Sequence, residues 1–248
     1  MPRFFVKTEQ IKDKEIIIIG EDVKHIKNVL RRQIGDNIEI CNQETGSTYK
    51  CEIAKIEDGK ITNNIVEEIT SSEDKIKVDI YQGLPKADKM ELIIQKSIEL
   101  GANAIIPVEM KRCVVKLDSK TESKKIERWQ KIAESAAKQS GRSTVPEIRQ
   151  MIKVEDIVKL KNEYDSIIVC YENEKQNYIK NELLKLKKLN KQEMHIAIII
   201  GPEGGLEEKD VEYLKQNGAA IVTLGNRILR TETVALNILS IIMYELEN

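Results

Sequence analysis

The stretch IAIIIGPEGGL at residues 196–206 determines how the rest of the chain is interpreted. Its first five residues are all apolar and mostly β-branched, which is typical of a strand buried on both faces of a parallel sheet. Glycines follow directly, and acidic residues within 207–210 predict the start of a helix, where the helix dipole favours negative charge. A strand, a glycine-rich turn and a helix in this order predict one unit of an α/β fold.

A second transition from strand to loop lies downstream, where AIVTL at 220–224 is followed by GNRILRTET at 225–233. Adjacent parallel strands would place both glycine-containing loops at the same edge of the sheet, which is the usual ligand edge. The spacing is neither GxGxxG nor GxxxxGK[ST], so neither nucleotide-binding fingerprint applies. Charged side chains at such an edge need partners, either one another or a ligand. An Arg230–Glu232 pair that merely closes the start of the helix is the simpler alternative.

The periodicity of the sequence changes near residue 70. Short strands close together predict a small β-barrel or sandwich before that point, and alternating strands and helices predict a parallel sheet covered on both faces after it. The predicted first-part elements are strands at 16–19, 37–41, 48–56 and 64–69 and a helix at 23–31. The predicted second-part elements are strands at 77–81, 104–108, 166–170, 196–200 and 220–224 and helices at 87–100, 122–140 and 231–246, with further helical segments between the strands. We expect a linker at 70–74 and two domains, at 1–70 and 71–248.

Composition excludes several classes of protein. The 248 residues are 41% hydrophobic and 33% charged, with a net charge of −1. No apolar run approaches the length of about 20 that spans a bilayer, and the N-terminus lacks the apolar region of a signal peptide. We therefore expect a cytoplasmic protein without a membrane segment. The four cysteines form no CxxC motif and the chain has only two histidines, which predicts reduced thiols and no metal site.

Basic residues gather in the middle of the chain, where residues 84–150 carry 14 Lys and Arg against 9 Asp and Glu. This excess permits a phosphate-rich partner such as RNA, and a solvated helix face is an equally good explanation of the charge alone. His25 and His195 belong to no Ser-His-Asp or Cys-His arrangement. A reaction that depends on positioning and a reactive cosubstrate therefore fits better than hydrolysis.

The two glycine-containing loops resemble those of the RsmE family, the ribosomal small-subunit RNA uracil N3-methyltransferases of the SPOUT class. The resemblance runs nearly end to end and includes RFF at 3–5, KADKM at 86–90 and AAKQSGR at 136–142. It implies a PUA-like, RNA-binding β-barrel followed by an α/β SPOUT domain with a C-terminal trefoil knot. It also implies S-adenosylmethionine as cofactor, 16S ribosomal RNA in the small subunit as partner, and a homodimer. The implied reaction is methylation of uracil N3 during small-subunit maturation, at the position conventionally numbered 1498.

The resemblance also implies roles for individual residues. The expected cofactor pocket comprises Ile200, Gly201, Glu203, Gly204, Leu224, Gly225, Ile228, Leu229 and Arg230. Arg230 is the expected catalytic cation, which favours the anionic form of the uracil, and Glu232 is expected to orient it. RNA contacts are expected from Arg3, His25, Arg31, Arg32, Lys86, Lys89, Arg112 and Arg142. The acceptor of the N3 proton is left open, with water as one candidate. Cys113 and Val234 depart from the family pattern, which often has Ser and Ala there, so Cys113 is a poor candidate for an essential group.

Three other functions are alternatives to this one. A sister SPOUT methyltransferase that acts on a ribose or on another base would share every cofactor residue and differ only in its basic loops. An RNA-binding assembly factor without catalysis would have no reason to retain Arg230 and Glu232. A nucleotide-dependent oxidoreductase would need the GxGxxG loop and a ribose-binding acid, and neither is present.

Overall fold

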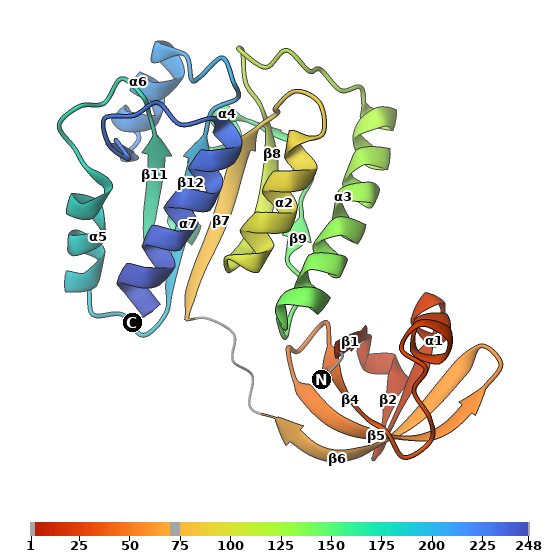
Figure 1. Cartoon of the computed structure of the whole chain (residues 1–248). Coiled ribbons are helices and arrows are strands. Elements are labelled where there is room, and N and C mark those ends of the chain that lie inside the picture. The colour runs from red at the N-terminus through yellow and green to blue at the C-terminus, as the bar shows by residue number, and fades with distance from the viewer. Residues whose placement is uncertain (1–2, 70–74, 248) are drawn as a thin grey trace. The chain divides into compact units, whose positions relative to one another are not determined.

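The computed structural model describes residues 3–69 and 75–247, so the predicted linker at 70–74 lies outside the described residues. The chain divides into two compact units (Figure 1). The first comprises Met1–Glu73 with Ala137–Val145, and the second comprises Asp74–Ala136 with Pro146–Asn248. The division thus differs from the domains expected at 1–70 and 71–248, because residues 137–145 belong with the N-terminal unit.

The first unit contains a six-stranded sheet in the order β1-β4-β5-β6-β3-β2, which Figure 1 shows strongly curled. Its strands are β1 (Arg3–Val6), β2 (Ile11–Lys12), β3 (Glu15–Ile19), β4 (Asn37–Asn42), β5 (Thr48–Glu57) and β6 (Lys60–Ile69). Alternating residues of these strands, Ile16, Ile18, Ile38 and Ile40 among them, form the core of the unit. The four predicted strands are confirmed. β1 was not predicted, because its three consecutive buried residues show no alternation.

The predicted helix of the first unit is shorter and less regular than its sequence suggests. A short α1 (Glu21–Lys24) continues into a single π-helical segment, η2 (His25–Val29). Val23 and Ile26 turn into the core. The His25 ring lies edge-on to Phe4, with 6.3 Å between the ring centroids.

The second unit is built on a seven-stranded, entirely parallel sheet in the order β10-β8-β7-β12-β11-β13, with β9 paired to β8. Its strands are β7 (Ile76–Gly83), β8 (Ala102–Glu109), β9 (Glu147–Ile148), β10 (Ile152–Lys153), β11 (Ser166–Cys170), β12 (Met194–Ile200) and β13 (Ala220–Val222). All five predicted strands are confirmed. The two glycine-containing loops do share one edge, but they do not follow adjacent strands, because β11 lies between β12 and β13.

The helices of this unit are α2 (Lys89–Glu99), α4 (Val154–Lys159), α5 (Ile179–Lys188), α6 (Glu208–Gln216), α7 (Thr231–Glu247) and most of α3 (Ser119–Ser140), whose residues from Ala137 onward belong to the first unit. After β13 at the margin of the sheet, the chain returns to its middle, where α7 packs on α2, β7 and β12. Figure 1 shows α2 and α7 side by side on one face. This return is the part of the chain for which the resemblance implies a knot, and the knot stays a prediction.

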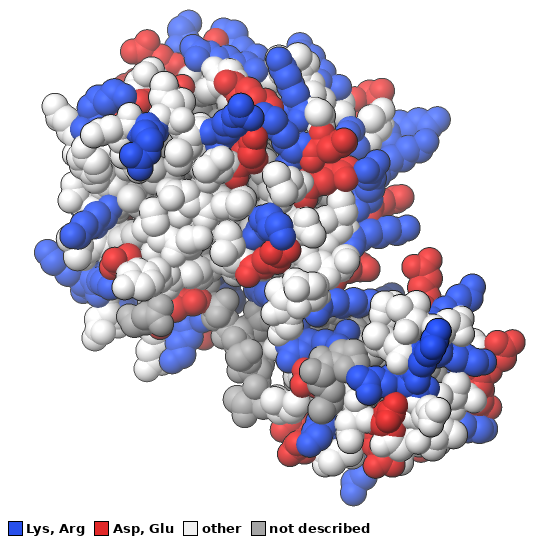
Figure 2. Space-filling model, in the orientation of Figure 1, with Lys and Arg blue, Asp and Glu red and all other residues white. Residues whose placement is uncertain are grey.

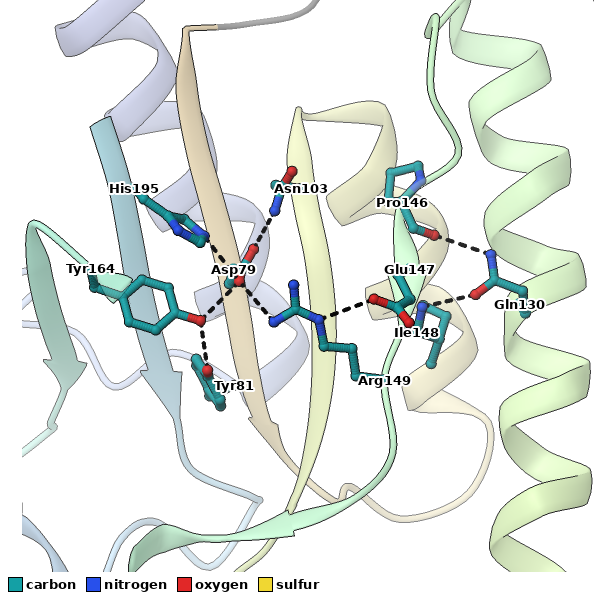
Figure 3. A network of polar contacts seen from close by, with 10 residues as sticks. All are labelled: Asp79, Tyr81, Asn103, Gln130, Pro146, Glu147, Ile148, Arg149, Tyr164 and His195. Carbon is teal, nitrogen blue, oxygen red and sulfur yellow. Dashed lines mark hydrogen bonds and ion pairs between the residues drawn. The ribbon is translucent and has the colours of Figure 1, made fainter. Parts of the chain in front are cut away.

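A buried carboxylate, Asp79 of β7, organises the opposite face of the sheet (Figure 3). Its side chain is completely buried, and it accepts hydrogen bonds from Asn103 Nδ2 at 2.6 Å and from Tyr164 Oη at 2.9 Å. Arg149 Nη1 and His195 Nε2 lie 3.3 and 3.1 Å from the same carboxylate. Burial alone raises the pKa of Asp79, but the His195 and Asn103 contacts and the Arg149 charge more than offset it, so the pKa lies below its usual value. Asp79 is therefore a charged anchor inside the unit.

Candidate functional site

A cavity of about 450 Å³ lies at the carboxyl edge of the parallel sheet. It is enclosed by the segments that follow β11, β12 and β13, together with Lys89 at the start of α2. Because all the strands are parallel, their carboxyl ends meet at this edge and bring together residues that are far apart in the sequence. The volume is in the range of small-molecule sites.

All nine residues expected to hold the cofactor line this cavity, namely Ile200, Gly201, Glu203, Gly204, Leu224, Gly225, Ile228, Leu229 and Arg230. The segment after β11 supplies further lining residues that were not predicted, among them Tyr171, Glu172 and Lys175. This segment, YENEK, contains no glycine and no recognisable motif. Only the strand order, with β11 between β12 and β13, reveals that it belongs to the site.

Close packing requires glycine both in the loop after β12 and at the end of β7, which lies against that loop. Gly83 ends β7, and a Cβ atom there would lie 2.7 Å from the ring of Pro202. A Cβ atom at Gly204 would lie 3.0 Å from the side chain of Arg112, whose Nη1 donates a hydrogen bond to the Gly204 carbonyl at 3.0 Å. Gly205 has a φ of 71°, in the left-handed region. The loop is thus held against its neighbours by backbone contacts that side chains would prevent.

Thr231 connects the loop after β12 to the start of α7. Its hydroxyl donates a hydrogen bond to the Gly201 carbonyl at 2.7 Å and accepts one from Gln82 Nε2 at 2.8 Å. Gln82 is completely buried and Thr231 nearly so. Three elements of the cavity wall, β7, the glycine loop and α7, are therefore joined at one hydroxyl group.

Lys89 is the most heavily paired cation at the cavity. Its Nζ lies 3.0 Å from Glu203 Oε1 and 3.3 Å from Glu232 Oε2. The hydrogen bond to Glu203, followed by that to Glu232, raises the pKa of Lys89. Burial raises the pKa of Glu203, but its own backbone N–H, Lys89 and the Lys86 N–H outweigh this and lower it. Both groups are therefore charged around neutral pH.

Arg230 and Glu232 are not arranged as expected. Arg230 lines the cavity with an exposed side chain and, among the described residues, makes no side-chain hydrogen bond or ion pair. Glu232 does not orient it, because the Glu232 carboxylate lies against Lys89 instead and is not part of the cavity lining. Arg230 directly precedes α7 and Glu232 is the second residue of that helix, and side chains two residues apart do not face each other there.

The residues expected to contact RNA lie in both units. Lys89 lines the cavity, and Arg112 is hydrogen-bonded to the Gly204 carbonyl. In the first unit, Arg3 forms an ion pair with Glu39 at 2.7 Å, and Arg32 lies 3.9 Å from Asp36. Arg31 and Lys86 are exposed, whereas Arg142 is half-buried. His25 packs on Phe4 with its ring largely exposed.

Residues 3–69 and 75–247 contain neither a cluster of metal-ligating side chains nor a helix that could span a membrane. No group of three or more His, Cys, Asp and Glu side chains there could hold a metal ion. No helix in this part of the chain is long and apolar enough to cross a membrane. The four cysteines are unbridged, and burial raises the pKa of Cys51 and Cys170 to about 12 and that of Cys113 above its usual value. The thiols of Cys51, Cys113 and Cys170 are therefore poor nucleophiles.

Comparison with known proteins shows relatives over the full length of the chain. Residues 72–243 match a family described as an RNA methyltransferase domain, and residues 18–65 match an RNA methyltransferase PUA domain. Ribosomal RNA small subunit methyltransferase E of Bacillus subtilis is 41% identical, over 100% of this chain and 98% of that protein. A crystal structure of the methyltransferase of the same name from Neisseria gonorrhoeae, bound to S-adenosyl methionine, is also similar to this chain. The two are 30% identical in sequence and superpose with a TM-score of 0.82, over 98% of this chain and 97% of that one.

Because these matches include both units, they define an RNA methyltransferase with a PUA domain and a SPOUT-type α/β domain, as the sequence predicted. Within that class, the full-length similarity shows that the chain belongs to the ribosomal RNA small subunit methyltransferase E family.

Proposed function

We propose that the protein transfers the methyl group of S-adenosylmethionine to N3 of a uridine in 16S ribosomal RNA, within the cytoplasmic small subunit during its maturation. One observation carries this proposal: all nine residues that the family resemblance assigns to the cofactor line one cavity. Relatives that cover nearly the whole chain are small-subunit RNA methyltransferases by name.

The cavity suits a cofactor that combines an adenine, a sulfonium and an amino acid. Ile200, Leu224 and Leu229 supply apolar surface for a flat base, and the neighbouring glycines leave backbone groups accessible to it. Glu172 and Glu203 supply carboxylates for cationic groups, and Arg227 and Lys175 supply cations for a carboxylate. Bound there, S-adenosylmethionine would supply an electrophilic methyl group.

Methylation at N3 requires the loss of the N3 proton and a linear approach of N3 to the methyl carbon. The new N–C bond forms as the C–S bond breaks, with the electron pair leaving on sulfur. The protein's contributions are positioning and electrostatic stabilisation of the ionised base. Arg230, an exposed cation on the cavity wall, is a candidate for that stabilisation. The uridine must also be unstacked to enter the cavity, which is cheapest in single-stranded or distorted RNA.

Transfer of labelled methyl groups tests the proposal directly. The protein is incubated with labelled S-adenosylmethionine and 16S RNA, presented both as naked RNA and as assembled small subunits, and the nucleosides are then analysed. We expect N3-methyluridine, formed on the assembled subunit. A different methylated nucleoside would move the function to a sister SPOUT enzyme. Cofactor binding without transfer to any RNA would favour the assembly-factor alternative.

A homodimer is part of the proposal, and α7 is its candidate interface. An open hollow of about 600 Å³ lies along α7 and is lined by Leu236, Asn237 and Ile241, among others. Figure 2 shows uncharged side chains gathered over α7. Within the described chain, the buried Oδ1 of Asn237 has no hydrogen-bond partner. A second copy could supply the missing donor and cover the apolar surface.

Basic residues in the predicted RNA footprint should affect the salt dependence of binding. Replacing Lys86 or Arg142 with alanine is expected to weaken binding to small subunits and to reduce the slope of log K against log salt by about 0.7–0.9 for each lost phosphate contact. The measurement is a binding titration at several salt concentrations, with Lys120→Ala, an exposed lysine of α3, as the matched control. An unchanged slope in both variants would place the RNA surface elsewhere.

A further inference from the structure

Lys89 was expected to contact an RNA phosphate, but its surroundings suit a different task. An ammonium group has three N–H donors in a tetrahedral arrangement. The Lys89 Nζ lies 3.0 Å from Glu203 Oε1 and 3.3 Å from Glu232 Oε2, so these two carboxylates can engage two of the donors. The side chain is 31% exposed and lines the cavity. One donor therefore remains for a group inside the cavity, and the two carboxylates fix its position.

The two carboxylates that hold the Lys89 ammonium group belong to different elements, and each of them is itself held in place. Glu203 lies in the loop after β12 and also accepts a hydrogen bond from the Lys86 N–H at 3.1 Å. Glu232 lies in the first turn of α7, where Thr231 joins that helix to the Gly201 carbonyl. A lysine side chain on its own moves freely, and its ordering is costly in entropy. Here the ordering is completed before any substrate binds.

The charge of the cavity is compatible with a developing anion. Its lining carries the cations Lys89, Lys175, Arg227 and Arg230, against two carboxylates, Glu172 and Glu203. Arg230 is exposed and has no side-chain partner in the described chain, so no neighbouring side chain fixes its position. Lys89 is the cation whose position is set in advance, and such preorganised donors contribute most to catalysis.

We propose that Lys89 is a catalytic residue that donates its remaining hydrogen bond to a carbonyl oxygen of the substrate base. This proposal rests on the proposed function, because it requires a substrate with an acidic N–H next to a carbonyl group. When N3 loses its proton to water, the negative charge is shared with the adjacent carbonyl oxygens. Lys89 stabilises this charge while N3 forms its bond to the methyl carbon and the carbon–sulfur bond breaks.

Removal of the ammonium group should lower kcat rather than raise KM. Loss of one preorganised donor to a developing oxyanion typically costs about 100-fold or more in kcat, and we expect a loss of that size for Lys89→Met. Binding of S-adenosylhomocysteine, measured by calorimetry, should be unchanged, and so should the salt dependence of binding to small subunits. Lys96→Met is the matched control, because Lys96 is also in α2 and is also paired with a carboxylate, Glu99, at 2.8 Å.

A more acidic substrate provides the decisive comparison. Fluorine at C5 of uridine withdraws electrons and makes the N3–H more acidic, so the anion needs less stabilisation. Small subunits assembled with 5-fluorouridine RNA should therefore restore most of the rate of Lys89→Met, while the wild-type protein gains much less. A double variant, Lys89→Met with Glu232→Gln, should remain impaired with ordinary uridine. The second change removes the carboxylate that Lys89→Met leaves without its cation, but it does not supply the missing hydrogen-bond donor.

Each other outcome overturns the assignment. Weakened binding of S-adenosylhomocysteine without rescue by 5-fluorouridine would show that Lys89 only holds the glycine loop. A shallower salt slope with a raised KM would return Lys89 to the RNA footprint. Full activity of the double variant would show that Lys89 merely neutralises Glu232. The same assay identifies the nucleoside made by the wild-type protein, so a product other than N3-methyluridine is recognised separately as failure of the proposed function.

Discussion

Replacement of Arg230 with alanine is expected to reduce methyl transfer by about 10²–10³-fold, the loss typical of a group that stabilises charge in a transition state. Arg230 lines the cavity, its side chain is exposed, and it makes no side-chain contact within the described chain. Its removal therefore breaks nothing that holds the fold together. The measurement is the rate of N3-methyluridine formation on assembled small subunits, with circular dichroism to verify the fold.

Two further variants make the Arg230 prediction specific. Arg230→Lys retains the charge without the planar fork of donors, and we expect intermediate activity. Arg128→Ala removes an exposed arginine of α3, paired with Glu91 and distant in sequence from both loops, and it should remain fully active. Normal turnover of Arg230→Ala would contradict the proposed role and leave Lys89 as the better candidate for stabilising the ionised base.

Replacement of Asp79 with asparagine is expected to lower the free energy of unfolding of the second unit by about 2 kcal/mol, because a neutral amide is a weaker acceptor than a carboxylate for the hydrogen bonds of Asn103 and Tyr164 and removes the anion beside the partly exposed Arg149. Asp79 is completely buried, and Arg149 and His195 lie within 3.3 Å of its carboxylate (Figure 3). The buried Trp129 of α3 is the only tryptophan of the chain. Its fluorescence during urea unfolding therefore reports on this unit specifically.

The effect of Asp79→Asn should depend on pH in a defined direction. The pKa of Asp79 is lower in the folded protein than its usual value. The carboxylate therefore contributes its stabilisation above the unfolded pKa, about 3.9, and loses it as the pH falls through the folded pKa. The wild-type advantage should be complete at neutral pH and shrink in strong acid. The control Glu99→Gln removes the carboxylate of a partly exposed pair and should cost about 0.5 kcal/mol or less. An equal effect of both variants would contradict the anchoring role of Asp79.

Much of the fold could be predicted from the sequence, because its strands carry strong local signals. The run 196–200 is apolar throughout and was correctly placed in a parallel sheet. The order of the strands could not be predicted, since hydrophobic periodicity does not specify which strands are neighbours. For that reason the segment after β11, with Glu172 and Lys175, was missed as part of the cavity wall. The knot came from family resemblance alone, because unknotted connections are the general rule.

The candidate site shows the same division between local and long-range information. The glycines of the two loops were correctly selected as cavity residues, because a close approach of the backbone requires them. The ion pair between Glu232 and Lys89 could not be predicted, since the two residues are more than 140 positions apart in the sequence. Ion pairs between segments so far apart depend on how α2 and α7 pack, which single-sequence patterns do not contain.

The assignment of residues 137–145 to the first unit has a consequence for dissecting the protein. The polypeptide passes between the units three times: after residue 73, after residue 136 and after residue 145. A single cut in the chain therefore yields no fragment that is a complete unit. A piece ending at residue 73 would lack part of its own fold, and a piece starting at residue 74 would carry nine residues that belong elsewhere. RNA binding by the β unit should therefore be studied with point variants of the whole chain.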